Sequence, residues 1–326
     1  MVEPRDETTF TVREVTDLDT RTRDDVLGID ADVRTTHGGD ALDEAGRRHL
    51  EHRGLADARL WLAEASGPDG RPRPGGFAYL RSAGDALDLT LAVRPAVAGN
   101  GVGTALADAA LADLPADGST EGPGHRIVAW RHTTAAGADA LAARSGFAAV
   151  RELLVMERPA AGLPDVAERS DVRVRSYAPD DAADLLRINA AAFAHHPEQG
   201  AMDERDLAER MAQDWFDPAG LLVAEDVATG AVLGFHWTKT SRRPGDSGPT
   251  GDGADGEVYV VGVAPEAQGR GLGKLLTLAG LHHLASWGVR RIELYVEGDN
   301  TTARAVYAGL GFEVVATHVQ YARGGS

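Results

Sequence analysis

The stretch GEVYVVGVAPEAQGRGLGKLLT, residues 256–277, decides the fold of this chain. It combines an apolar run typical of a strand, a turn with closely spaced glycines, and the start of a helix. A similar stretch, LDLTLAVRPAVAGNGVGTAL, occupies residues 87–106, about 170 residues earlier. The valine, the proline and the glycines of the two copies align. The repeat predicts a chain built from two copies of one domain.

The same order of elements surrounds both copies. Each half begins with an extended segment and a helical region and continues with a hairpin and the repeated stretch. A strand, a helix and a segment that starts with Gly-Phe then close each half. The 326 residues suit two domains of about 150 residues each. We therefore expect a first domain over 1–158, a linker rich in Ala, Pro and Gly over 159–169, and a second domain over 170–326.

Composition narrows the functional classes. The net charge of -17 disfavours nucleic-acid binding, because contacts to phosphates need clustered Lys and Arg. No apolar run approaches the roughly 20 residues that span a membrane, and the N-terminus lacks the apolar stretch of a signal peptide. The chain has no cysteine, which excludes disulfides, thiolate nucleophiles and Cys-based metal sites. We expect a cytoplasmic enzyme that binds neither nucleic acid nor a membrane.

The turn QGRGLGK, residues 268–274, has the features of an anion-binding loop. Closely spaced glycines let backbone N–H groups converge, and the helix N-terminus adds positive potential. Two nucleotide-binding patterns fail on spacing. A P-loop needs Ser or Thr after Gly-Lys, but Leu275 follows Lys274. A dinucleotide fingerprint needs G-x-G-x-x-G, whereas both copies give G-x-G-x-G.

The pattern V-x-P-x-x-Q-G-R-G-L-G, starting at Val263, closely resembles the acetyl-CoA pyrophosphate loop of the GCN5-related N-acetyltransferase (GNAT) superfamily. Asn300 at a helix start and the segment YAGLGF at 307–312 resemble the last helix and strand of that superfamily. The resemblance implies an α/β (α+β) fold of two tandem GNAT domains, each a mixed twisted sheet flanked by helices. It implies acetyl-CoA as co-substrate, held by Val261, Gly262, Val263, Gln268, Gly269, Arg270, Gly271, Leu272, Gly273, Lys274, Asn300, Thr301, Thr302, Ala303, Arg304 and Ala305.

The first copy of the turn, AGNGVGT at 98–104, keeps the glycines but lacks the arginine. Two interpretations stay open: it binds acetyl-CoA through its backbone alone, or it is a relic of the duplication. The matching candidate contacts are Leu91, Ala92, Val93, Gly99, Asn100, Gly101, Val102, Gly103 and Thr104.

Two residues of the second half are candidates for the chemistry. The superfamily transfers acetyl directly to an amine, which arrives as ammonium and needs a base, while the departing thiolate needs a proton donor. Glu257, at the head of the strand before the turn, is the base candidate, and Tyr307 is the acid candidate. By the repeat, Glu257 corresponds to Leu87, and strand alternation places Asp88 on the opposite face. Tyr307 corresponds to Ala142, so we expect the first half to be non-catalytic.

Four phrases of the second half resemble one family within the superfamily, mycothiol synthase of actinobacteria. They are AAFAHHPEQG at 191–200, GFHWTK at 234–239, GEVYVVGV at 256–263 and LYVEGDN at 294–300. The family acetylates the cysteinyl amine of a cysteinyl-glucosaminyl-inositol, the last step in making mycothiol. By matching positions, the resemblance implies substrate contacts from Glu44, Glu198, Lys239, Glu257 and Tyr295. A substrate with one ammonium and many hydroxyls suits such carboxylates with Lys and Tyr donors.

Other expectations and alternatives accompany this interpretation. The His pairs at 195–196 and 282–283 are adjacent in sequence rather than at i and i+4, so we expect no metal. The Gly-rich segment 242–256 has no counterpart in the first half and reads as a loop insertion or a substrate lid. Because the duplication pairs two domains, we expect a monomer. An acetyltransferase acting on another small amine or a protein N-terminus, and a non-catalytic acetyl-CoA-binding regulator, are the alternatives.

Overall fold

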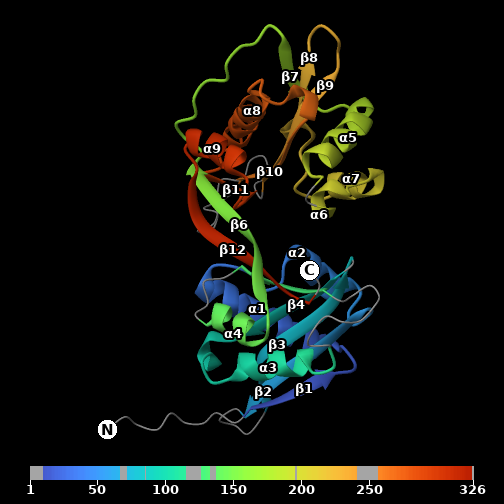
Figure 1. Ribbon diagram of the computed structural model, residues 1–326, viewed down its shortest axis with the longest axis vertical. Coiled ribbons are helices and arrows are strands. Elements are labelled where there is room, and N and C mark those ends of the chain that lie inside the picture. Colours follow the sequence, from blue (N-terminus) through green and yellow to red (C-terminus); the bar gives the residue numbers. More distant parts are fainter. Residues whose placement is uncertain are drawn as a thin grey trace, which may run out of the picture. The chain divides into compact units, whose positions relative to one another are not determined.

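The chain forms two compact units in a computed structural model that describes residues 10–66, 72–84, 86–114, 126–132, 137–194, 197–240 and 256–324. The first unit holds residues 1–152 and 317–326, and the second holds residues 153–316 (Figure 1). The predicted insertion at 242–256 falls outside the described residues except for Gly256.

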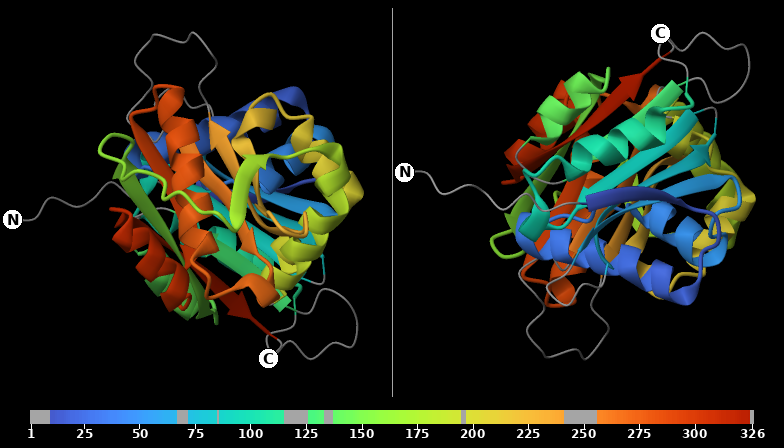
Figure 2. Two further views of the ribbon diagram at one scale, coloured as in Figure 1. Left: turned by 90° about the horizontal axis from the view of Figure 1, so that it is seen from above. Right: turned by 90° about the horizontal axis from the view of Figure 1, so that it is seen from below.

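The first unit is a six-stranded mixed sheet with helices on both faces. Its neighbours are antiparallel except β4 and β5, which are parallel. The strand order is β1 (Phe10–Val15), β2 (Ala58–Ser66), β3 (Pro72–Ala83), β4 (Ala86–Val93), β5 (Arg126–Arg131) and β12 (Glu313–Arg323). One face packs against α1 (Thr20–His37) and α2 (Glu44–His52), the other against α3 (Val102–Leu111) and α4 (Ala138–Arg144). The view from below in Figure 2 shows α1 and α3 on opposite sides of the strands.

The second unit repeats this plan. Its order is β7 (Val172–Ser176), β8 (Leu221–Asp226), β9 (Val232–Thr240), β10 (Gly256–Val263), β11 (Arg291–Glu297) and β6 (Ala148–Pro159). Only β10 and β11 are parallel neighbours. One side carries α5 (Ala182–Ala192), α6 (Pro197–Gly200) and α7 (Glu204–Met211), and the other carries α8 (Leu272–Ser286) and α9 (Thr301–Gly309) (Figure 1).

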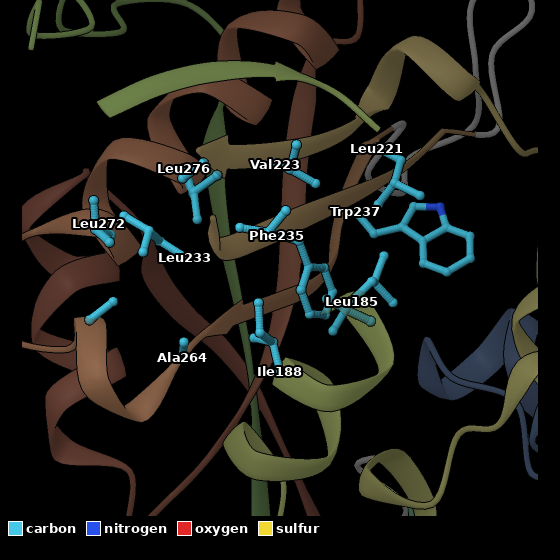
Figure 3. Packing of buried hydrophobic residues seen from close by; sticks show 14 of the residues in the cluster. Leu185, Ile188, Leu221, Val223, Leu233, Phe235, Trp237, Ala264, Leu272 and Leu276 are labelled. Carbon is cyan, nitrogen blue, oxygen red and sulfur yellow. The ribbon is translucent and has the colours of Figure 1, made fainter. Parts of the chain in front are cut away.

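The core of the second unit follows from the period-2 pattern of its strands. Residues 232–238 of β9 are all buried, because helices cover both faces of this central strand. On one face, Phe235 packs against Leu185 and Ile188 of α5. On the other, Leu272 and Leu276 of α8 close the core (Figure 3). Moving a side chain of this size from water into the core contributes about 1.5–3 kcal/mol to the stability of the folded unit.

The closing strands are exchanged between the halves of the sequence. Residues 319–323 of β12 pair antiparallel with β5, so the end of the chain completes the first unit. Residues 153–159 of β6 pair with β11 and complete the second unit. The compact units therefore differ from the predicted ranges 1–158 and 170–326 in their last strands. The sequence could not reveal this, because an apolar alternation defines a strand but not its partner.

Candidate active site

The glycine turn of the second unit has the backbone that the sequence predicts. Gly269 and Gly271 both have φ near +77°, a left-handed conformation that favours glycine. Nothing lies within 4 Å of a Cβ built at either position. Gly271, the N-cap of α8, has no side chain and therefore does not itself cap the N–H groups of the first turn. The turn is therefore an open anion-binding site at a helix N-terminus.

Hydrogen bonds hold the turn to the segment that precedes β7. The Arg270 guanidinium lies 3.0 Å from Asp171, and the Arg270 carbonyl accepts a hydrogen bond of 2.7 Å from Arg169. Arg169 also forms an ion pair with Asp171. The predicted cofactor contact Arg270 thus also fixes the position of its loop.

The strands β10 and β11 separate just before this turn. Their described parallel pairing covers three pairs and ends at Val258 and Leu294. A bulge at Tyr259 then shifts the register between β10 and β9. The predicted cofactor contacts Val261, Gly262 and Val263 therefore lie where β10 has left β11, with backbone groups facing the gap.

A transverse row of charged residues crosses the sheet at the point where the strands begin to separate. Lys239 of β9 is the register partner of Glu257, and Glu257 is the partner of Glu293. Glu293 is in turn the partner of Glu157 on β6. Partners on neighbouring strands point to the same face, here the face of α5. The row, defined as Lys239–Glu257–Glu293–Glu157, thus places three carboxylates beside one ammonium.

The electrostatics of the row follow from this crowding. The Lys239 ammonium lies 3.4 Å from the Glu257 carboxylate, and Arg291 lies 3.2 Å from Glu157. Burial, together with the neighbouring carboxylates Glu257 and Glu157, raises the pKa of Glu293 to about 7. The row is an anionic surface with one carboxyl that titrates near neutral pH.

Aromatic side chains border the row on its Lys239 side. The Lys239 ammonium lies 5.3 Å from the centre of the Trp215 ring and 5.4 Å from that of Tyr259. Arg210 of α7 donates a hydrogen bond of 2.9 Å to the Tyr259 hydroxyl. A cation flanked by ring faces keeps its charge at low desolvation cost.

Two further predicted substrate contacts lie on the short helix α6 and on the strand β11. Glu198 belongs to α6, whose position is fixed where the buried Asn189 donates 2.6 Å to the Gln199 carbonyl; the Glu198 side chain is outside the described set. Tyr295 lies on β11 on the same face as Glu293 and is 42% exposed. Its neighbours along the strand, Leu294 and Val296, are buried.

Helix α9 carries the acid candidate. Burial raises the pKa of Tyr307 to about 12, so its hydroxyl keeps its proton at neutral pH. The ring packs against Phe312 with centroids 5.9 Å apart and belongs to the same cluster as Val261. Asn300 caps the helix by accepting from the Ala303 N–H at 3.0 Å, so the predicted contacts 300–305 form the helix start.

The first unit has the same glycine turn and a different row. Gly99 and Gly101 have φ of +80° and +82° and precede α3, with no side-chain cap. The row is Arg81–Asp88–Val128–Ala322 by register. Glu44, the predicted substrate contact, is the first residue of α2, and its side chain is outside the described set.

The expected correspondence of Glu257 with Leu87 is wrong. Asp88 is the register partner of Arg81, as Glu257 is of Lys239, so Asp88 occupies the place of Glu257. The bulge at Tyr259 inserts one residue into β10, and β4 has no such shift. Asp88 is nevertheless bound in a buried ion pair, 2.5 Å from Arg81. The first unit has kept a carboxylate but paired it with a permanent cation.

Sequence reasoning missed Glu293 and Glu157. The segment RIELYVE at 291–297 alternates apolar and polar residues, which predicts that Glu293 and Tyr295 share a face. The register that sets Glu293 beside Glu257, and the exchanged strand that brings Glu157, are not encoded in any local pattern. Among the described residues, no group of three or more His, Asp or Glu side chains is arranged to hold a metal ion. None of the described helices is both long and apolar enough to cross a membrane.

Comparison with known proteins identifies relatives along most of the chain. Residues 184–312 match the acetyltransferase (GNAT) family. A mycothiol acetyltransferase from a Nocardioides species is 51% identical over 82% of this chain and 90% of that protein. One from Nocardia farcinica is 44% identical over 97% of this chain and 99% of that protein. One from Mycolicibacterium smegmatis is 42% identical over 89% of this chain and 92% of that protein.

Solved structures confirm the predicted fold class. A GCN5-related N-acetyltransferase from Sphaerobacter thermophilus matches with a TM-score of 0.68 at 20% identity, over 97% of both chains. A tandem GNAT protein from the clavulanic acid biosynthesis pathway matches with a TM-score of 0.63 at 20% identity, over 98% of this chain and 100% of that chain. Each covers both units, as a duplicated fold requires.

Proposed function

The chain belongs to the mycothiol acetyltransferase family of GNAT proteins, and on this premise we propose that it acetylates the cysteinyl amine of a cysteinyl-glucosaminyl-inositol. The acetyl donor is acetyl-CoA, as in other GNAT acetyltransferases. The observation that carries the proposal is the anionic row at the point where β10 and β11 separate, on the strand that leads into an open glycine turn. A cationic amine is attracted to the row and meets a thioester held by the turn.

The second unit provides a site that fits acetyl-CoA. The turn and the start of α8 offer N–H groups to a pyrophosphate, which has the charge such a site prefers. The separated segment of β10 offers backbone groups to the pantetheine amides. The residues in this role are Val261, Gly262, Val263, Gln268, Gly269, Arg270, Gly271, Leu272, Gly273, Lys274, Asn300, Thr301, Thr302, Ala303, Arg304 and Ala305.

Glu257 acts as the base for the acceptor amine. The acceptor arrives as an ammonium, and Glu257 accepts a proton from it so that the nitrogen lone pair can attack the thioester carbon. The Lys239 ammonium lies 3.4 Å from the Glu257 carboxylate that accepts this proton. Tyr307 donates its proton to the departing thiolate, and its raised pKa means that it carries this proton beforehand. The balance is one amide and one thiol formed, with one proton released to water.

The acceptor contacts combine charge and hydrogen bonding. Tyr295, exposed on the face of the row, offers a ring and a hydroxyl to the sugar, while Lys239 offers N–H donors. The family resemblance adds Glu198 and Glu44 as further candidate contacts. We assign the substrate to Glu44, Glu198, Lys239, Glu257 and Tyr295.

The first unit supports the second and does not catalyse. Its row lacks a carboxylate free of an arginine partner, and Ala142 stands where the second unit has Tyr307. Its glycine turn binds a second acetyl-CoA through backbone groups alone, at Leu91, Ala92, Val93, Gly99, Asn100, Gly101, Val102, Gly103 and Thr104. The protein acts as a cytoplasmic monomer.

The direct test is turnover with the proposed acceptor. The protein is incubated with acetyl-CoA and cysteinyl-glucosaminyl-inositol, and the N-acetylated product is followed by mass spectrometry, because the acceptor's own thiol obscures thiol reagents. Glucosaminyl-inositol, which lacks the cysteinyl group but keeps an amine, is the matched control. Product from the first acceptor and none from the second is the expected result.

Two other outcomes identify the alternatives. Turnover on polyamines, antibiotics or peptide N-termini without turnover on the cysteinyl acceptor would replace the proposed substrate. Binding of acetyl-CoA without turnover on any amine would make the protein a regulator.

A further inference from the structure

The row of the second unit has more carboxylates than a single general base requires. Glu293 stands between Glu257 and Glu157, with register partners on both neighbouring strands. Neighbouring strands lie about 4.8 Å apart, so adjacent like charges repel. In the first unit the places of Glu293 and Glu157 are taken by Val128 and Ala322, which carry no charge. The same fold is therefore built without these carboxylates, and its structure does not require them.

The position of Glu293 makes it sensitive to the charge of Glu257. The groups that face it are the carboxylates Glu257 and Glu157 and the cations Lys239 and Arg291. Each cation is already close to a different carboxylate: Lys239 to Glu257 and Arg291 to Glu157. Glu293 is half-buried, and its burial together with the two neighbouring carboxylates raises its pKa to about 7. Two interacting carboxyls titrate as a pair, and their apparent values belong to both.

We infer that the general base of this site is the carboxyl pair Glu257–Glu293, in which Glu293 is a positioning residue that raises the proton affinity of Glu257. The inference rests on the proposed function and deepens it. When both carboxyls are ionised, the pair takes up one proton near neutral pH, which matches a base to the pH at which it works. Glu257 receives this proton from the acceptor ammonium, and the negative charge of Glu293 makes the transfer more favourable. The pair then returns the proton to water, so the balance of the reaction is unchanged.

The first test is the pH dependence of kcat with saturating acetyl-CoA and cysteinyl acceptor. For the unchanged protein, kcat should rise as the pH passes through about 7, where the pair loses its last proton. In Glu293→Gln the rise should move to lower pH by more than about one unit, and the plateau should fall about tenfold because the remaining base is weaker. Glu293→Asp should move the rise back toward that of the unchanged protein. Glu313→Gln, which removes an exposed carboxylate of β12, is the matched control and should change neither.

Two outcomes of the pH measurements would contradict the inference. A Glu293→Gln protein with an unchanged profile and plateau would overturn it. So would an inactive Glu293→Asp protein that still binds acetyl-CoA, since a carboxyl at this place would then not suffice.

The second test needs no acceptor and separates this inference from the proposed function. Carbon NMR of protein labelled at the glutamate δ carbons follows each carboxyl during a pH titration. One resonance should titrate near 7, disappear in Glu293→Gln, and shift toward 4.5 in Glu257→Gln as the neighbouring charge is removed. A resonance unaffected by Glu257→Gln would show that the two carboxyls are not coupled. If coupling is observed but no amine is acetylated, the proposed function fails and the coupled pair stands.

Discussion

The glycine turns of the two units share one backbone conformation, whereas the rows of register partners beside them carry different charges. Gly101 and Gly271 begin their helices with nearly equal φ, and both turns lack a side-chain cap. The rows beside them are Arg81–Asp88–Val128–Ala322 and Lys239–Glu257–Glu293–Glu157. One row contains a single carboxylate held by arginine, and the other contains three carboxylates and one lysine. The difference teaches that the backbone of the glycine turn and the charges of the row are separate features of this fold, and that the two copies share the first and differ in the second.

The largest effect should come from removing the exchanged strand of the first unit. Deleting residues 317–326 removes Val319 and Tyr321, which are buried beside β5, and each such loss costs about 2–5 kcal/mol. We expect β1–β5 to lose protection from hydrogen exchange while β8–β11 keep it. A chain that ends at Arg323 is the control. Unchanged protection of β5 would contradict the strand exchange.

The second-largest effects should come from replacing Glu257 and Asp88, the two carboxylates at equivalent register positions of the two units. Glu257→Gln should lower kcat about 10²–10⁴-fold, because the base is lost, with the Kd of acetyl-CoA unchanged. Asp88→Asn should leave kcat unchanged but reduce the free energy of unfolding by about 3 kcal/mol, because Arg81 loses the nearer of its two carboxylate partners, Asp88, and keeps only Asp43 at 3.6 Å. Steady-state kinetics and urea unfolding of both variants measure this. A large fall in kcat for Asp88→Asn would show that the first unit takes part in the chemistry.

The third effect concerns stability rather than rate. The pKa of Glu293 is higher in the folded protein than its ordinary value of 4.5, so the folded state loses stability as the pH rises from 4.5 through about 7. Replacing this carboxyl with Gln removes the penalty. We expect Glu293→Gln to be more stable than the unchanged protein by up to about 3 kcal/mol at pH 8 and by little at pH 5, in urea unfolding. An equal difference at both pH values would mean that ionisation of Glu293 is not its cause.

The smallest effects should come from the glycine turns. Alanine in the left-handed conformation costs about 1–2 kcal/mol, so Gly271→Ala should raise the KM for acetyl-CoA up to about tenfold. Gly101→Ala should leave that KM unchanged and weaken a second acetyl-CoA site, seen as a change in calorimetric stoichiometry. A stoichiometry of one in the unchanged protein would reveal the first turn as a relic.

Most of the fold could be predicted from the sequence because its signals are local. The glycine turns, the hairpins and the order of elements follow from residue types at short spacing, and the capping role of Asn300 follows in the same way. The repeat also predicted that the first half has no tyrosine at this place, because Ala142 corresponds to Tyr307.

The rest depends on register, which is not local. A bulge of one residue at Tyr259 made Leu87 look like the counterpart of Glu257, although Asp88 holds that place. The same limitation hid Glu293, since a polar residue at alternate positions does not reveal its neighbour on the next strand. The partners of β6 and β12 could not be assigned either, because both strands show the same kind of alternation between apolar and polar residues.

The strand exchange has a consequence for the birth of the protein on the ribosome. Residues up to 316 suffice for the second unit, but the first unit needs residues 319–323 to complete its sheet. The N-terminal part of the chain, made first, must therefore wait until residues 319–323 have been synthesised. The usual order, in which N-terminal domains fold first, is reversed. Until residues 319–323 emerge, the edge of β5 lacks this partner, and the nascent chain exposes a strand edge for which a chaperone or a neighbouring chain can compete.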